Sequence, residues 1–204
     1  MNILLHSTIY VIALLAVPIL SADEHERLRL RGTIESTLDV LYGESDISFD
    51  EKQVKIRAIL EDNYDLDVMI RRAIGRNWRL MSESEQVRVL ELVRQLVLKA
   101  YIKALDGKDR PLVSLGEEIL ISEKRMEIES TVLLGEQTFY ILYRLGRMRS
   151  GWQIYDIVAE GSISVVSNYR QQFDDHFRQG SGAELITRLE DLLQQDLFNE
   201  KTKI

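Results

Sequence analysis

The spacing of apolar residues changes twice along this chain, and these changes limit the folds that the sequence can adopt. Up to about residue 105, apolar side chains recur every three or four positions, as in amphipathic helices. After Pro111 they recur at every second position, as in strands. Helical spacing returns from about residue 162. Helices, then strands joined by short turns, then helices again predict one α+β domain with an antiparallel meander.

The first half of the chain is expected to be helical. The predicted helices span residues 25–42, 49–62, 64–74 and 83–105. Two Ser-x-x-Glu sequences, Ser48 with Glu51 and Ser82 with Glu85, match the capping box that begins a helix. The last of the four helices is apolar around most of its circumference, so we expect it to be buried on most sides and to form the spine of the domain.

The predicted sheet has four strands, and two of them lack a polar face. The strands span residues 118–121, 126–134, 139–145 and 152–159. In the last two strands, apolar side chains point to both faces, whereas a sheet with one wet face alternates apolar and polar residues. We therefore expect one face to pack on the long helix and the other to be covered by the terminal helices or to line an apolar cavity. Two packed layers without a cavity remain the alternative.

The N-terminus predicts export. Residues 9–20 form one apolar run, which Ser21 and Ala22 follow, as in a secretory signal peptide with a small-residue cleavage site. An uncleaved membrane anchor is the alternative, because no Lys or Arg precedes the run. The predicted organisation is a signal peptide over residues 1–22 and a single domain over residues 23–204. The absence of Cys suits an oxidising periplasm.

Composition excludes several classes of function. The formal net charge of −7 argues against binding to nucleic acid, whose phosphates attract Lys and Arg. The chain has no Cys, three His, no Gly-rich phosphate loop and no metalloprotease or hydrolase motif. We therefore expect no metal, no cofactor and no catalytic residue. Glu127 and Glu129 share a strand face, but we interpret them as solvated. Asp156 is either a buried acid or a polar group at a strand end.

Basic residues offer one further hypothesis. Arg144, Arg147, Arg149 and Arg170 are expected near one end of the sheet, where they would meet an anionic headgroup or a partner. The alternative is that Arg147 and Arg149 are ordinary turn residues.

Two stretches of the chain carry a family resemblance. The first is YDLDVMIRRAIGRNW at residues 64–78, which continues through Ser82, Glu85 and Gln86 into the long helix that ends at Ala100 and Tyr101. The second is GWQIYDIVAEGSISVVSNYRQQF at residues 151–173, followed by GAELITRL at residues 182–189. In this order they resemble the MlaC family of periplasmic phospholipid-binding proteins, also called the toluene-tolerance auxiliary family. A hopanoid-associated branch, HpnM, resembles the same motifs.

The resemblance implies a lipid carrier. It implies an α+β fold related to the nuclear-transport-factor-like cone, with an apolar pocket for the acyl chains of a phospholipid. It also implies partners: an outer-membrane lipoprotein complex and an inner-membrane ABC transporter with an MCE-domain subunit. Together with the doubly apolar strands, it predicts a pocket between the sheet and the helices. The predicted lining residues are Leu66, Met69, Leu96, Tyr140, Leu142, Tyr155, Ile157, Val165, Val166 and Tyr169.

Other functions remain open at this point. One is a nuclear-transport-factor-like enzyme, which needs an acid such as Asp156 or a His inside the pocket. Another is a binder of a hopanoid or steroid-type small molecule. A third is a module that binds only a protein partner, which predicts no cavity.

Overall fold

The computed structural model describes residues 22–43, 47–105, 108–149, 151–159 and 163–201. The predicted signal peptide, residues 1–22, lies outside these ranges apart from Ala22. The elements are α1 (Ala22–Tyr42), α2 (Phe49–Glu61), α3 (Leu66–Ile74), the 3-10 helix η1 (Gly75–Leu80), α4 (Glu83–Leu105), β1 (Leu112–Ser122), β2 (Arg125–Leu134), β3 (Gln137–Met148), β4 (Gly151–Ala159), β5 (Ile163–Ser164), α5 (Val165–Phe177) and α6 (Gly182–Lys201).

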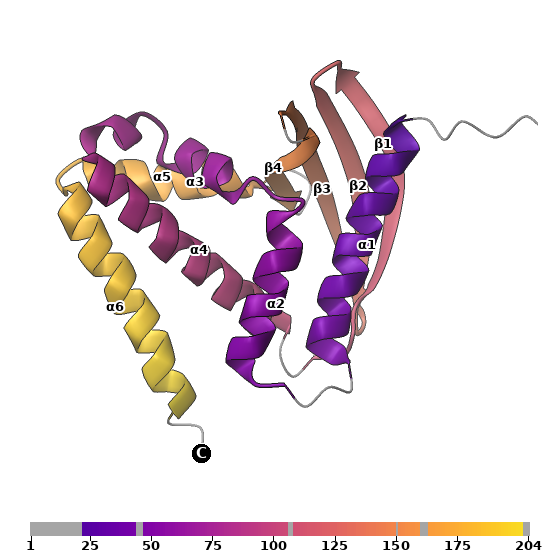
Figure 1. The fold of residues 1–204 in the computed structure, drawn as a ribbon, viewed down its shortest axis with the longest axis horizontal. Coiled ribbons are helices and arrows are strands. Elements are labelled where there is room, and N and C mark those ends of the chain that lie inside the picture. The colour runs from indigo at the N-terminus through magenta and orange to yellow at the C-terminus, as the bar shows by residue number, and fades with distance from the viewer. Residues whose placement is uncertain (1–21, 44–46, 106–107, 150, 160–162, 202–204) are drawn as a thin grey trace, which may run out of the picture.

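The predicted α+β architecture is confirmed. Helices precede an antiparallel meander, and two helices follow it (Figure 1). Both predicted capping boxes form, at Ser48–Glu51 and Ser82–Glu85. A third box, which we did not predict, opens α6: the Ser181 N–H donates to the Glu184 carboxylate at 2.9 Å, and the Glu184 N–H donates to the Ser181 hydroxyl at 3.3 Å. Among the described residues, no helix has the length and apolar character needed to cross a membrane.

The sheet is longer at its edge and has one more strand than the sequence predicted. Its order is β1-β2-β3-β4-β5, with each strand antiparallel to its neighbours. The first strand was predicted from residue 118, but β1 begins at Leu112, which pairs with Leu133. The extra strand, β5, is two residues long and pairs with the end of β4.

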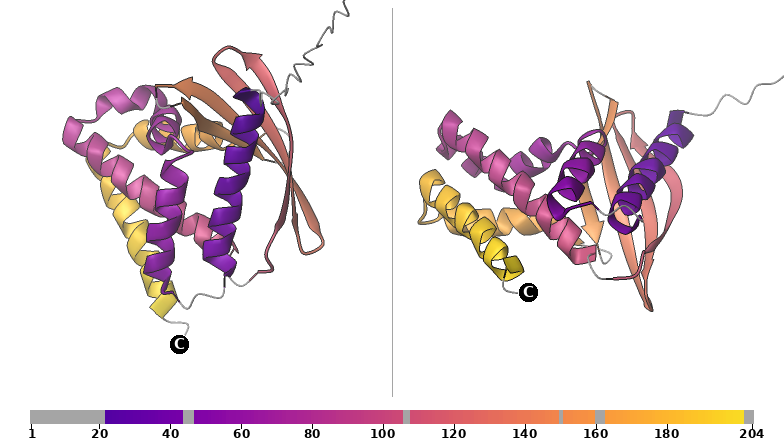
Figure 2. Two further views of the ribbon diagram at one scale, coloured as in Figure 1. Left: turned by 45° about the vertical axis from the view of Figure 1, so that its right-hand side comes forward. Right: turned by 60° about the horizontal axis from the view of Figure 1, so that its bottom comes forward.

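The helix that covers the sheet is α1, so the expectation that the long helix packs there is wrong. Leu30 of α1 is buried against one face of the sheet, with Ile34 beside it. On that face the buried strand residues are Met126, Ile128, Tyr143, Leu145 and Ile154. In contrast, α4 packs mainly on α6 and α2 (Figures 1 and 2). The apolar sides of α4 are buried against other helices. The sheet is covered by α1 instead.

The expectation that both faces of the sheet are dry holds only at β4. On the face away from α1, Asp156 and Val158 of β4 are buried. Tyr140 of β3 points to the same face and is 64% exposed. The helix α5 follows directly from β5 and contacts β4, so it covers only this edge of the sheet.

Candidate functional site

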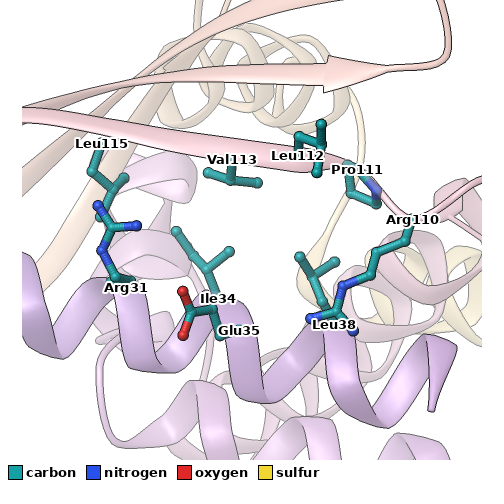
Figure 3. Close-up of a pocket in the computed structure, with 9 residues that line it drawn as sticks. All are labelled: Arg31, Ile34, Glu35, Leu38, Arg110, Pro111, Leu112, Val113 and Leu115. Atoms are coloured by element: carbon teal, nitrogen blue, oxygen red, sulfur yellow. The ribbon is translucent and has the colours of Figure 1, made fainter.

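A groove runs between α1 and the edge strand β1 (Figure 3). Ile34 and Leu38 lie four residues apart and therefore share one face of α1. Val113 and Leu115 project toward them from β1 (Figure 3). The groove has a volume of about 180 Å³. Its lining residues are Arg31, Ile34, Glu35, Leu38, Arg110, Pro111, Leu112, Val113 and Leu115.

Charged side chains flank this apolar groove. Arg31 lies toward Leu115, and Arg110 lies beside Leu38 at the other end (Figure 3). The Arg110 guanidinium pairs with the Asp39 carboxylate at 2.7 Å. Glu35 also lies at this rim, between the two arginines (Figure 3). An apolar floor with arginines at its rim matches an amphipathic ligand with an anionic group, whose apolar part leaves water while its charged part stays at the surface.

Three tyrosines form a wall on the same side of the sheet. Burial raises the pKa of Tyr64 well above its usual value, and the nearby Tyr143 and Tyr101 raise it further. Burial likewise raises the pKa of Tyr143, although the nearby Ser130 hydroxyl opposes this effect. Burial raises the pKa of Tyr101 to about 12, with a further contribution from Tyr143. The tyrosines, from three separate elements, therefore lie close together in a poorly solvated space.

The chain holds Tyr64 beside the sheet through its backbone. The Ile154 N–H donates to the Asn63 carbonyl at 2.9 Å, and the Asp65 N–H donates to the Ile154 carbonyl at 3.2 Å. This pairing extends the sheet beyond β4 by a short parallel bridge at Tyr64. The connection between α2 and α3 is thereby fixed against the sheet.

Tyr101 is the partly exposed member of this wall. Its side chain is 38% exposed, as is that of Val97 one turn earlier on α4. The raised pKa shows that the protein nevertheless shields the phenol from water. Ile34 and Leu115 of the groove pack against the cluster that contains Tyr143, so the groove and the tyrosine wall adjoin.

The structure distributes the ten predicted lining residues over several places. Val166 is buried, and Tyr140 and Tyr169 are exposed. The other seven are half-buried: Leu66, Met69, Leu96, Leu142, Tyr155, Ile157 and Val165. None of the ten lines the groove between α1 and β1. As the lining of a lipid pocket, the set stays a prediction.

Individual members of the set lie in distinct surroundings. Leu66 lines a pocket of about 20 Å³ between α2, α3 and α4. Leu96 packs against the cluster of α3, α4 and α6, whereas Ile157 packs against the cluster of α1 and the sheet. The Tyr155 ring lies under the Arg72 guanidinium, 4.4 Å from its carbon to the ring centroid.

Asp156 serves as a structural anchor. Its carboxylate accepts hydrogen bonds from the Ser164 hydroxyl at 2.9 Å and from the Val166 N–H at 3.3 Å. It also accepts from the Ile157 N–H at 2.9 Å and pairs with the Arg144 guanidinium at 3.2 Å. These contacts fix the start of α5 against β4, on the face opposite the tyrosine wall. Of the two alternatives that the sequence left open, Asp156 is therefore the buried acid.

The sequence analysis missed the groove, although part of its signal was present. The apolar residues at helical spacing in 25–42 indicated an amphipathic helix, but nothing indicated which partner it covers. The first half of β1 was not predicted, so the sequence analysis did not place the β1 residues that line the groove. No group of three or more His, Asp or Glu suited to a metal ion occurs among the described residues.

Comparisons with known proteins agree with this architecture. Residues 31–191 match a family model described as MlaC protein. A solved phospholipid-binding protein from Ralstonia solanacearum, in complex with a phospholipid, superposes with a TM-score of 0.74 at 19% sequence identity. The match covers 83% of this chain and 97% of that one, and it shows a shared fold.

Other comparisons add little. A domain of unknown function with a cystatin-like fold from Nostoc punctiforme is 20% identical over 50% of this chain and 68% of that one. Its TM-score of 0.29 is too low to indicate a shared fold. No curated protein matches the chain significantly.

Proposed function

The chain belongs to the MlaC family, and from this membership we propose that it is a carrier that holds the acyl chains of a phospholipid between its sheet and its helices. The observation that carries the proposal is the apolar groove between α1 and β1, whose Ile34 and Leu115 pack against the cluster that contains Tyr143. The relative from Ralstonia solanacearum, which was solved with a phospholipid, supports the same class of ligand.

The chemistry of the ligand explains why such a carrier needs no catalytic group. Each methylene of an acyl chain costs about 0.8 kcal/mol to expose to water. A chain of about sixteen carbons therefore costs on the order of 12 kcal/mol to expose. A carrier lowers this cost with an apolar site for the chain and leaves the headgroup in water. In our proposal Arg31 and Arg110 meet the phosphate at the rim of the groove.

The groove must widen to take a whole acyl chain. Its volume of about 180 Å³ corresponds to roughly six water-sized groups. We propose that α1 moves away from β1 on loading, and that the chain then reaches the tyrosine wall. The ten residues predicted from the sequence would belong to the deeper part of this space.

The cellular role proposed here follows the family. We propose that residues 1–22 direct export to the periplasm, and that the domain of residues 23–204 carries phospholipid between an outer-membrane lipoprotein complex and an inner-membrane MCE-domain ABC transporter. Neither a metal nor a cofactor takes part in this role. The polar anchor at Asp156, far from the wall, gives no support to the alternative of an enzyme.

Filling the groove tests this function. We expect Val113→Trp to fold and to retain much less phospholipid than the unaltered protein after incubation with phospholipid vesicles, because the indole occupies the apolar floor. The matched control is Val54→Trp on α2, where the side chain is 69% exposed. The measurement is the phospholipid content of the repurified protein. Equal retention in both variants would show that the groove does not hold lipid.

A further inference from the structure

One end of the sheet gathers apolar and cationic side chains at its surface. Arg125 pairs with Gly146, and Met148 pairs with Gly151, so the β1–β2 turn and the β3–β4 turn lie at the same end. The Arg147 N–H donates to the Lys124 carbonyl at 3.1 Å and joins the two turns. We call this surface the hairpin end; its members are Ile119, Leu120, Ile121, Lys124, Arg125, Arg147 and Arg149.

The apolar part of the hairpin end lies uncovered. Ile119, Leu120 and Ile121 are consecutive, and their exposed fractions are 47%, 53% and 54%. They lie just before the end of β1, which is an edge strand (Figure 1). Proteins usually protect an apolar edge of this kind with charges or with a covering element. In the part of the chain that the structure describes, Ile119 and Ile121 point to one face of this strand end and Leu120 to the other, so apolar side chains are exposed on both faces and indicate a contact with something apolar.

The cationic part is available for an external anion. Within the described ranges, no side-chain ion pair or hydrogen bond forms at Lys124, Arg125, Arg147 or Arg149. Glu123 is the exposed acid in the β1–β2 turn. This local excess of positive charge stands out on a chain whose formal net charge is −7.

The other two arginines considered in the sequence analysis serve the fold itself. Arg144 pairs with Glu127 at 3.1 Å and with Asp156 at 3.2 Å. The Arg170 Nε donates to the Arg72 carbonyl at 3.0 Å. Only Arg147 and Arg149 of the four therefore remain for an anionic ligand.

We propose that the hairpin end docks on the surface of an anionic phospholipid bilayer. Leu120 and Ile121 enter the interface, while the four cations meet lipid phosphates. A turn that combines apolar residues with Lys and Arg has the two attractions on which interfacial binding depends, apolar burial and charge. A few side chains on a narrow projection also suit a fluid interface better than a protein partner, which needs a larger and shape-matched surface. The contact goes beyond the proposed carrier function, because it lies outside the groove.

The absence of Cys permits a site-specific test in the full chain. Ile121→Cys, labelled with an environment-sensitive fluorophore, is expected to brighten and shift to the blue with vesicles that contain phosphatidylglycerol. Pure phosphatidylcholine vesicles should give a much smaller response. The control is Val54→Cys on α2, which is expected to give no response with either vesicle. The proposal is overturned if the label at residue 121 does not respond to anionic vesicles, a result that would favour a protein partner. It is also overturned if the labels at residues 121 and 54 respond equally.

Charge reversal separates docking from lipid carriage. In the Ile121→Cys background, Lys124→Glu with Arg147→Glu should weaken binding to the anionic vesicles about tenfold or more. Lys55→Glu with Arg57→Glu on α2 is the matched control and should have little effect. The phospholipid content of the purified variant should stay unchanged; its loss together with vesicle binding would assign these residues to the carrier site and overturn the proposal. If the unaltered protein holds no phospholipid but residue 121 still responds, the carrier proposal fails and the docking surface stands.

Discussion

Tyr101 lies on the last turns of α4, where its side chain is partly exposed and yet shielded from water. The same environment that makes the wall suitable for an acyl chain also disfavours the charged phenolate. Burial raises the pKa of Tyr101 to about 12, above the value of 10.0 that an unfolded chain retains. Between these values the unfolded chain loses a proton that the folded protein keeps, so the phenol destabilises the fold as the pH rises.

Tyr101→Phe tests this linkage. Below about pH 10 both states keep the proton, so the tyrosine causes no loss of stability there. From pH 10 to pH 12 we expect the unaltered protein to lose stability faster than Tyr101→Phe. The measurement is the urea midpoint as a function of pH, and Tyr169→Phe on the exposed side of α5 is the control. Parallel curves for all three proteins would show that Tyr101 is not shielded.

Asp156 is a second residue whose surroundings specify its role. Because it is 6% exposed and accepts several hydrogen bonds, its removal leaves buried donors without an acceptor. We expect Asp156→Ala to lower the free energy of unfolding by about 2–4 kcal/mol. Asp191→Ala, at an exposed position of α6, should change it by less than about 0.5 kcal/mol. Urea unfolding measures both, and equal effects would contradict the anchoring role.

The elements show which parts of the fold can be predicted from sequence. Helices and strands follow local periodicity, so α1, α2, α4, β2 and β4 were predicted to within a few residues. Ser48 and Ser82 marked helix starts because a capping box is a local motif. The first half of β1 was missed because Pro111 and the turn residues before it obscured the alternation.

Packing between elements could not be predicted in the same way. The sequence shows that α4 is apolar on several sides, but not that α6 and α2 use those sides. It shows that α1 is amphipathic, but not that β1 lies opposite Ile34 and Leu38. The groove arises from residues more than seventy positions apart, and helix phase or strand register in one segment does not determine such a pairing. The predicted pocket residues were therefore spread over several environments.

The capping box of α4 allows a prediction at the scale of one element. The Glu85 N–H donates to the Ser82 hydroxyl at 3.4 Å, and the Ser82 N–H donates to the Glu85 carboxylate at 2.7 Å. These hydrogen bonds from Ser82 lower the pKa of Glu85. Ser82→Ala should lower the free energy of unfolding by about 1 kcal/mol. The control is Ser36→Ala at an exposed position inside α1, where alanine should have no cost; equal destabilisation of both variants in urea would contradict the cap.

At the scale of the whole molecule, α1 contributes to two of the hydrophobic clusters formed by the described residues and so links the sheet to the helical layer. One cluster joins α1 to the sheet, another joins α3, α4 and α6, and a third joins the ends of α1 and α4 to α2. The cluster of α3, α4 and α6 contains no residue of α1, so a movement of α1 away from β1 can leave that cluster intact. The proposed carrier function requires such a movement, because the groove is smaller than an acyl chain.

The phospholipid content of the protein itself tests the central claim most directly. We suggest purification without detergent, followed by mass spectrometry of the organic extract and of the intact protein. The account predicts a phospholipid in stoichiometric amount, bound to a folded protein. A folded protein that stays free of lipid after incubation with phospholipid vesicles, or that holds only a hopanoid or steroid-like molecule, would contradict it.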